Sequence, residues 1–132
     1  MTTPHPHIAS FMQRQGLAPE QLRSDGRLTL VVDDRYRVHM APCANGGLAL
    51  IARVMSLPED RVDRQALIDR VLKKSAALLQ KHPSTLTVDP HEDALHLQQI
   101  IPQEELSPDS LDSAMGEFTN ALSYWTTTGI TS

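Results

Sequence analysis

Hydrophobic and polar residues alternate in two neighbouring stretches of the chain, residues 28–32 and 36–40. Alternation with period two is typical of strands that bury one face, so the sequence predicts two antiparallel β-strands here. A three-residue loop sets Val32 against Tyr36, whereas a two-residue loop would set Val32 against Arg35 and mix core residues with charge. Because a one-residue slip turns every side chain to the other face, we predict the three-residue loop. Arg35 is a poor residue for the left-handed conformation that such a loop needs.

A third stretch, residues 48–57, is apolar on both faces and follows a break at residues 42–47. One face carries Leu48, Leu50 and Val54, and the other carries Ile51, Met55 and Leu57. A strand with this pattern is covered on both sides in a folded protein. We therefore predict a third strand, covered on one side by the chain's own helices and on the other by a partner.

Ile8, Phe11 and Met12 follow the spacing i, i+3, i+4 and form one apolar stripe, which predicts a first helix over residues 5–15. Gly16 is a natural end for this helix. The stripe lies near the N-terminus, where contacts with a core are hardest to complete. Two interpretations stay open: the helix docks on the sheet, or it forms a groove for another chain, where the adaptable Met12 side chain would suit the contact.

A second helix is predicted over residues 64–81, with Asp63 as its N-cap. On a helical wheel its apolar arc spans about 140°, and charged and polar residues fill the far side. The arc consists of Leu67, Ile68, Val71, Leu72, Ser75, Leu78 and Leu79. It is broader than one contact with a sheet needs. We interpret it as a dimer surface, with burial under a long loop as the alternative.

Two short strands and a last helix complete the predicted elements. Residues 86–88 and 95–101 alternate as strands, joined by a turn. Ser107 suits the N-cap of a helix that extends to residue 125, and its core-facing stripe is Leu111, Met115, Phe118, Leu122 and Trp125. The order helix, three strands, helix, two strands, helix predicts a compact α+β sandwich with a twisted antiparallel sheet. We expect one domain over residues 1–132, with residues 1–7 and 127–132 as flexible tails.

The chain has 132 residues, a net charge of −4 and a pI near 5.8. This charge argues against a nucleic-acid partner, and no apolar run approaches the roughly 20 residues of a membrane span. The N-terminus lacks the apolar core of a secretory signal, so we expect a cytoplasmic protein. Cys43 is the single cysteine, so no internal disulfide can form, and we expect an unreactive thiol.

No pattern in the sequence indicates catalysis, a cofactor or a metal site. None of the six histidines forms the i, i+4 helical pair of a zinc peptidase. The glycines of residues 45–47 lack the Lys and Ser/Thr of a phosphate-binding loop. Adjacent polar residues such as His91, Glu92 and Asp93 point apart, so they do not converge on one substrate atom. We therefore expect no enzyme activity and no cofactor.

Several short strings occur in a specific order along residues 8 to 126. They are Gly16-Leu17, Ser24-Asp25-Gly26-Arg27-Leu28-Thr29-Leu30, Val31-Val32-Asp33-Asp34, Leu57-Pro58-Glu59-Asp60, Leu86-Thr87-Val88-Asp89-Pro90, Ala94-Leu95-His96-Leu97 and Phe118 to Trp125. With the small size and acidic pI, they make the chain resemble the class I type III secretion chaperones, the Tir chaperone (CesT) family. It departs from the family in the basic residues Lys73, Lys74 and Lys81 and in the loop at residues 42–47.

The resemblance implies a secretion-chaperone-like fold and a small cytoplasmic homodimer from a bacterium with a type III secretion system. Such a dimer has no catalytic activity, holds the N-terminal region of an effector extended and soluble, and helps to deliver it to the secretion ATPase. By the family pattern, the dimer interface falls on Leu67, Ile68, Val71, Leu72, Leu78, Leu86 and Val88. The effector-binding surface falls on Ile8, Phe11, Met12, Val31, Leu97 and Ile100.

Two other classes of function stay open on the sequence alone. One is a small α+β enzyme or metabolite-binding domain, which predicts a deep concave site with converging polar groups. The other is a generic dimeric adaptor that acts on folded proteins. The nature of the bound partner distinguishes the three: an extended effector segment, a small molecule or a folded protein.

Overall fold

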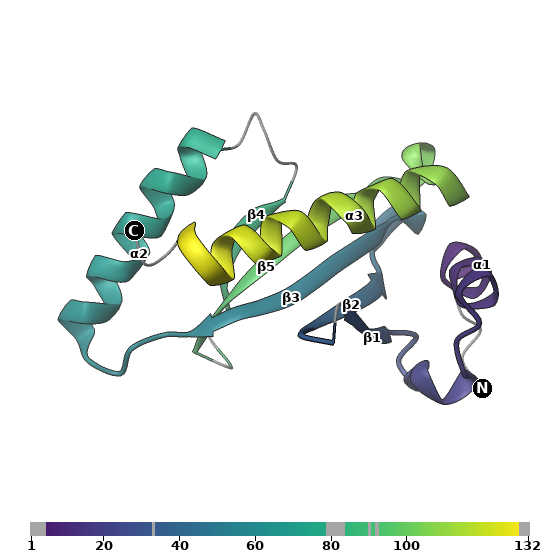
Figure 1. The fold of residues 1–132 in the computed structure, drawn as a ribbon, viewed down its shortest axis with the longest axis horizontal. Helices are drawn as coiled ribbons and strands as arrows, with labels where there is room; N and C mark the ends of the chain where they lie inside the picture. Colours follow the sequence, from purple (N-terminus) through teal and green to yellow (C-terminus); the bar gives the residue numbers. More distant parts are fainter. Residues whose placement is uncertain (1–4, 33, 79–83, 90, 92, 130–132) are drawn as a thin grey trace.

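The computed structural model of the chain describes residues 5–32, 34–78, 84–89, 91 and 93–129. Its main elements are α1 (Pro6–Gln15), β1 (Leu28–Val32), β2 (Tyr36–Pro42), β3 (Leu48–Ser56), α2 (Arg61–Leu78), β4 (Thr85–Asp89), β5 (Ala94–Ile101) and α3 (Pro108–Tyr124), as Figure 1 shows. This is the order that the hydrophobic pattern predicts. The predicted α+β class with an antiparallel sheet is therefore confirmed.

The five strands form one antiparallel sheet in the order β1-β2-β3-β5-β4. Val32 pairs with Tyr36 across the first hairpin, so the predicted three-residue loop is confirmed. Asp34, rather than Arg35, takes the left-handed conformation, with a φ of 54°. Aspartate accepts this conformation better than arginine, because its short polar side chain can bond to the local backbone.

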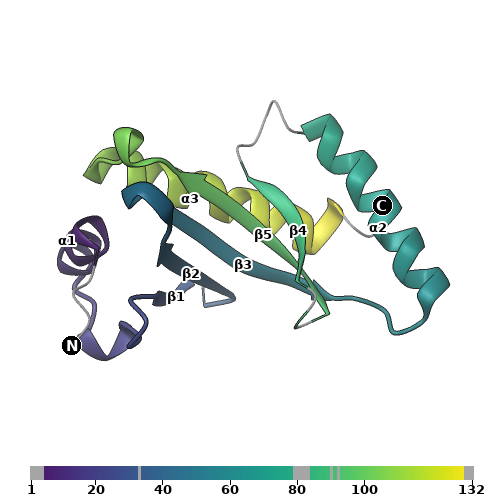
Figure 2. The same cartoon turned by 180° about the vertical axis from the view of Figure 1, so that it is seen from behind.

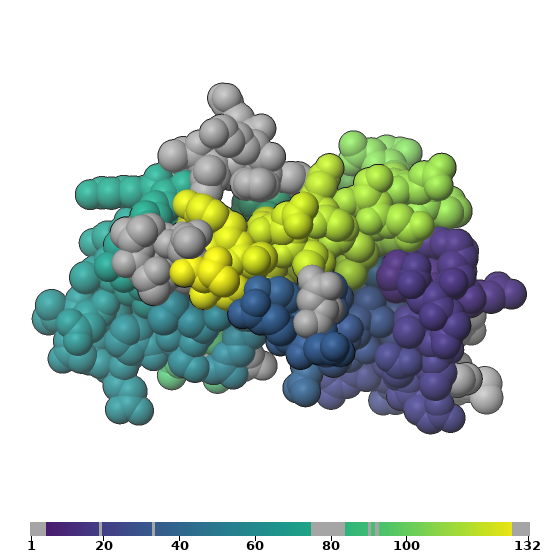
Figure 3. Space-filling view, in the orientation of Figure 1, coloured from purple at the N-terminus to yellow at the C-terminus, as the bar shows by residue number. Residues whose placement is uncertain are grey.

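Helix α3 crosses one face of the sheet and closes the core, as Figures 1 and 3 show. A capping box fixes its first turn: Ser110 N–H donates to Ser107 Oγ at 3.0 Å, and Ser107 N–H donates to Ser110 Oγ at 2.8 Å. The buried residues of this helix are Leu111, Ala114, Met115, Phe118, Ala121 and Leu122. Burial of one side chain as large as that of Phe118 contributes about 2–3 kcal/mol, so the stripe is a major source of stability.

Strand β3 is the central strand of the sheet, and a bulge between Arg53 and Met55 interrupts its pairing with β5. The bulge sets Met55 opposite Leu95 on the core face, so our prediction that Met55 shares a face with Ile51 is wrong. A bulge adds one residue to a strand and reverses the alternation beyond it, which a period-two pattern does not reveal. Figure 2 shows no described helix over the second face of β3, and the cover of that side by a partner stays a prediction.

Helix α2 begins at Arg61, three residues before the predicted start. The N-cap is Asp60 rather than Asp63, because the Asp60 carboxylate accepts a hydrogen bond from Asp63 N–H at 3.0 Å. The helix packs beside the edge strand β4, and Leu67 and Val71 are its buried residues among the side chains that the structure describes. The predicted end at residue 81 lies outside the described residues.

Helical structure extends into both predicted tails. His5 is the N-cap of α1, and its Nδ1 accepts a hydrogen bond from His7 N–H at 3.1 Å. At the other end, a π-helical turn over Trp125–Gly129 continues α3, and Thr126 Oγ1 donates to the carbonyl oxygen of Leu122 at 2.8 Å. Residues 1–4 and 130–132 lie outside the described part of the chain.

Candidate functional site

The sheet has one open face, opposite the face that α3 covers. In Figure 2 the strands β3, β5 and β4 lie in front of α3, and no described helix lies in front of them. Because side chains alternate along a strand, the register assigns every second residue to this face. It carries Thr29, Val31, Arg37, His39, Ala41, Ala49, Ile51, Arg53, Thr85, Thr87, His96, Gln98 and Ile100. We call this surface the open face.

Two large apolar side chains on the open face are exposed to solvent. Val31 on β1 is 63% exposed and Ile100 on β5 is 57% exposed. Ile100 pairs with Ala49 on β3, and Ala49 pairs with Ala41 on β2. We call Ile100 and the neighbouring Ala41 and Ala49 the apolar patch, in which Ile100 is the exposed contact for a side chain of an extended polypeptide.

Helix α1 fills the core and does not offer an open groove. Ile8 is fully buried and Phe11 is 6% exposed, while Met12 packs against the core and is half-buried. The Arg14 guanidinium lies 5.7 Å from the centre of the Phe11 ring. His5 Nε2 lies 2.7 Å from the carbonyl oxygen of Gly46, which fixes the start of the helix to the loop before β3.

The six residues predicted to hold an effector therefore do not form one surface. Ile8, Phe11 and Leu97 are buried in the chain's own core. Val31 and Ile100 lie on the open face, and Met12 lies at the edge of the core. For the first helix, this burial favours the alternative in which the helix packs on the chain's own core, where it contacts α3. The hydrophobic stripe alone could not distinguish a helix buried in the chain's own core from one that binds an effector, because both need the same apolar spacing.

The predicted dimer residues divide into buried and exposed sets. Leu67 and Val71 are buried, Ile68 and Leu86 are half-buried, and Leu72 and Val88 are exposed, Leu72 by 60%. The side chain of Leu78 lies outside the described part of the structure. Leu72 and Val88 are thus the predicted dimer residues with most apolar surface left uncovered in a single chain.

Val62 is an apolar surface residue that the sequence reasoning missed, and it is 75% exposed. Val62 lies before residue 64, where the sequence pattern places the start of the second helix. The signal that could have found it is Asp60, which has the residue type and the spacing of an N-cap for a helix that includes Val62.

A hollow lies beside strands β2, β3 and β5 and includes open-face residues of all three strands in its lining. Its lining includes Arg27, Arg35, Arg37, Arg53, His39 and His96, with Tyr36, Leu122 and Thr126 from the core side. Asp89 is the one acidic residue among the lining residues that the structure describes, and its Oδ2 lies 3.9 Å from His96 Nδ1. Thr29 Oγ1 lies 3.0 Å from His39 Nδ1. The guanidinium groups can bind anions.

Neither a metal centre nor a membrane span is found in the described part of the chain. No three His, Cys, Asp or Glu residues in it are placed to hold a metal ion. No helix in it has the length and apolar character needed to cross a bilayer. What the described geometry does offer is an open sheet face, an exposed apolar set at α2 and β4, and an arginine-lined hollow.

Comparison with protein families gives one match, which covers nearly the whole chain. A family model described as the Tir chaperone protein (CesT) family matches residues 7–126. No curated protein sequence matches the chain. The matched range includes every helix and strand from α1 to α3 apart from the first residue of α1.

Solved structures with the same fold include three protein complexes. A chain of the HopA1–SchA chaperone–effector complex is 21% identical, with a TM-score of 0.65 over 89% of this chain and 88% of that chain. A chain of the ExsC–ExsE complex is 18% identical, with a TM-score of 0.72 over 97% and 94%. A chain of the ExoU–SpcU complex from the type III secretion system of Pseudomonas aeruginosa is 17% identical, with a TM-score of 0.66 over 90% and 94%. At these identities the likeness establishes the fold.

Proposed function

Because the chain belongs to the Tir chaperone protein (CesT) family, we propose that it is a type III secretion chaperone for one or more effectors. It binds the N-terminal chaperone-binding region of an effector and holds that region extended and soluble. It then assists delivery of the effector to the secretion apparatus, where the secretion ATPase is the expected contact. The family match over residues 7–126 is the observation that carries this proposal.

The proposed effector surface is the open face, with Val31 and Ile100 as its apolar contacts. This revises the surface expected from the sequence, since Ile8, Phe11 and Leu97 are already covered. Strand β1 is an edge of the sheet, and beyond Leu28, which is bridged to Leu22, its outer backbone groups can pair with an extended segment. An unfolded segment loses conformational entropy on binding, and a broad surface with backbone hydrogen bonds offsets that loss.

The proposed assembly is a homodimer through α2 and β4. Leu72 and Val88 expose apolar surface there, and β4 is the second edge of the sheet. A second copy that covers these residues would remove that surface from water. Each Å² of apolar area buried in this way contributes about 25 cal/mol of favourable free energy. Two open faces on one dimer would also raise the effective concentration of the second contact for a long effector segment.

In this proposal the protein acts in the bacterial cytoplasm by binding alone, with neither catalysis nor a cofactor. Two of the structures that share its fold are described as a chaperone–effector complex and as a type III secretion complex. Those descriptions support an effector as the partner here. They also favour an effector over a metabolite or a folded partner.

Co-expression with the N-terminal segments of candidate effectors tests the proposal. We expect one segment to become soluble and to co-purify with the chain, while the rest of that effector remains dispensable. Hydrogen exchange should show the bound segment protected only where it contacts the chaperone, as an extended chain would be. If no secreted protein of the same bacterium provides such a segment, or if the bound partner is a folded domain, the proposal is wrong.

A further inference from the structure

Charge is distributed unevenly over this acidic chain. Residues 82–132 contain none of its lysines or arginines, and α3 carries Asp109, Asp112 and Glu117. The open face, by contrast, has basic side chains: Arg37 and Arg53 are exposed on it, and Arg27 and Arg35 line the same hollow. Four of the nine arginines of the chain therefore line one hollow, and Asp109, Asp112 and Glu117 of α3 are not among its lining residues.

Arg37 and Arg53 are neighbours across two strands. Val38 pairs with Ala52, so Arg37 and Arg53 are the next residues along β2 and β3 and lie on the same face. Arg53 in turn pairs with His96 on β5. Like charges on facing strand positions destabilise a sheet, so stability alone does not explain why Arg37 and Arg53 lie side by side. We call Arg37, Arg53 and His96 the basic row.

No ion pair within the described part of the chain involves Arg27, Arg35, Arg37 or Arg53, and Asp89 is the acidic residue that lines the same hollow. Among the described residues, ion pairs join Arg14 to Asp112 and Arg64 to Asp93, and the Asp89 carboxylate lies 3.9 Å from His96 Nδ1. None of these pairs involves the four arginines of the hollow. Arg53 donates to Ser56 Oγ, and the Arg35 guanidinium lies 5.2 Å from the centre of the Tyr36 ring. These contacts orient the guanidinium groups and leave their charge available to an anion.

The basic row and the apolar patch lie at a fixed spacing on the open face. His96 of the basic row and Ile100 of the patch are both on β5, four residues apart. At about 3.3 Å per residue, they are separated by roughly 13 Å along the strand. A bound polypeptide in extended form rises by the same distance per residue. An acidic side chain and an apolar side chain about four residues apart can therefore reach both places.

We propose that the open face selects an acidic stretch of the effector segment, whose carboxylates bind the basic row while a nearby apolar side chain covers Ile100. This inference rests on the proposed chaperone function and adds the chemistry of the client. A polypeptide fits better than a nucleic acid, because a polynucleotide offers no aliphatic side chain for Ile100 and its many phosphates would be repelled by the net charge of −4. Acidic clients are also steered away from the acidic surface of α3.

Fluorescence polarisation with synthetic peptides tests this inference on the full chain. The probe peptide carries a neutral dye, a leucine and two glutamates, and the first glutamate follows the leucine by four residues. A second peptide has glutamine in place of each glutamate. We expect the glutamate peptide to bind roughly tenfold more tightly at low salt, with most of that advantage lost at about 0.3 M salt. A leucine eight residues from the first glutamate should lower the affinity.

The test variant is Arg37→Gln with Arg53→Gln, and the matched control is Arg70→Gln with Lys73→Gln. The control pair is exposed on α2, away from the hollow, and changes the net charge equally. We expect the test variant to bind both peptides with equal affinity and the control to retain the roughly tenfold preference. The melting temperature of the test variant should be no lower than that of the native chain, because a like-charged pair is removed.

Several outcomes would overturn the inference. One is equal binding of the two peptides by the native chain, and another is the same loss of preference in both variants. Tighter binding of single-stranded DNA than of the glutamate peptide would assign the hollow to nucleic acid instead. If the test variant still captures the full effector segment as tightly as the native chain, the acidic preference is wrong while the chaperone function stands. If the native chain captures no effector segment, the proposed function itself fails.

Discussion

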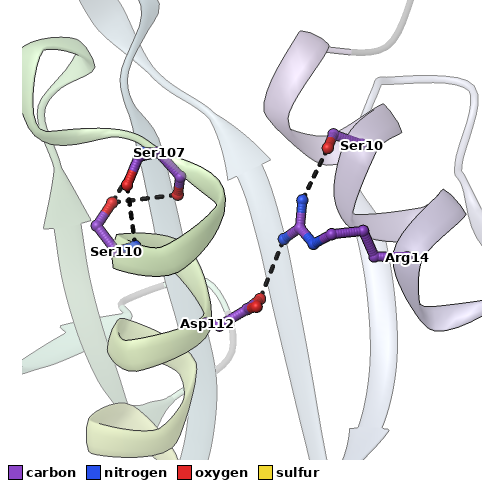
Figure 4. A network of polar contacts seen from close by, with 5 residues as sticks. All are labelled: Ser10, Arg14, Ser107, Ser110 and Asp112. Carbon is purple, nitrogen blue, oxygen red and sulfur yellow. Dashed lines mark hydrogen bonds and ion pairs between the residues drawn. The ribbon is translucent and has the colours of Figure 1, made fainter.

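The guanidinium of Arg14 on α1 lies 3.0 Å from the carboxylate of Asp112 on α3. The same guanidinium donates to Ser10 Oγ at 2.7 Å, as Figure 4 shows. These contacts join the first helix to the last, over 98 positions of sequence. They lie above the buried Phe11 and hold α1 in place as a part of the core.

Loss of this link should change the stability of the fold only slightly. Both side chains of the pair are partly exposed to water, so solvent screens their attraction. We expect Arg14→Ala to lower the free energy of unfolding by about 0.5–1 kcal/mol, including the lost contact with the Phe11 ring. Urea denaturation measures this change in the free energy of unfolding. A loss of more than about 3 kcal/mol would mean that the pair, and not the apolar stripe beneath it, holds α1.

Phe11→Ala should have a much larger effect, because the side chain is almost fully buried. We expect a loss of about 3 kcal/mol in the free energy of unfolding, from lost burial and from the cavity left behind. Met12→Ala, at the edge of the same stripe, is the control and should cost less. A Phe11→Ala chain that is as stable as the native chain would show that α1 does not belong to the core.

Leu72→Glu should dissociate the proposed dimer without unfolding the chain. Leu72 is exposed in a single copy, so a charge there is harmless to the monomer but is costly to bury against a second copy. The control is Ser113→Glu on the exposed side of α3. Analytical ultracentrifugation should find monomers for Leu72→Glu and dimers for the control. Dimers in both would place the interface elsewhere.

Ile100→Ser should weaken effector binding and leave the fold intact, since the isoleucine side chain is more than half exposed. Loss of one partly buried apolar contact predicts about 1–2 kcal/mol in binding free energy, or about tenfold in affinity. Val62→Ser removes an apolar side chain of α2 that is 75% exposed, against 57% for Ile100, and serves as the control. Calorimetric titration with the effector segment measures both affinities. If Ile100→Ser and Val62→Ser both bound the segment as tightly as the native chain, Ile100 would not be part of the effector surface.

Most of the architecture could be predicted from the sequence because its signals are local. The register of the first hairpin followed from the apolar pairing of Val32 with Tyr36, and the last helix from Ser107 and its stripe. The bulge at Arg53 could not be predicted in this way, since it depends on how β3 pairs with a strand more than forty residues later. The start of α2 was misplaced because Asp60 and Asp63 are both suitable N-caps.

The candidate site was harder to predict than the fold. A stripe such as Ile8 and Phe11 shows that a face is apolar, but not whether the chain itself or a partner covers it. The basic row was missed for a related reason: Arg37 and Arg53 are far apart in sequence, and only the register of β2 on β3 makes them neighbours. Exposed residues such as Ile100 could be assigned to a surface only after the covered face of the sheet was known.

The most direct test of the account is the mass of the purified complex by light scattering. We expect a particle of two chains, twice 14.6 kDa, plus the mass of the effector segment, and a particle of twice 14.6 kDa when the segment is removed. A particle of one chain that binds no effector segment at any concentration tested would contradict it.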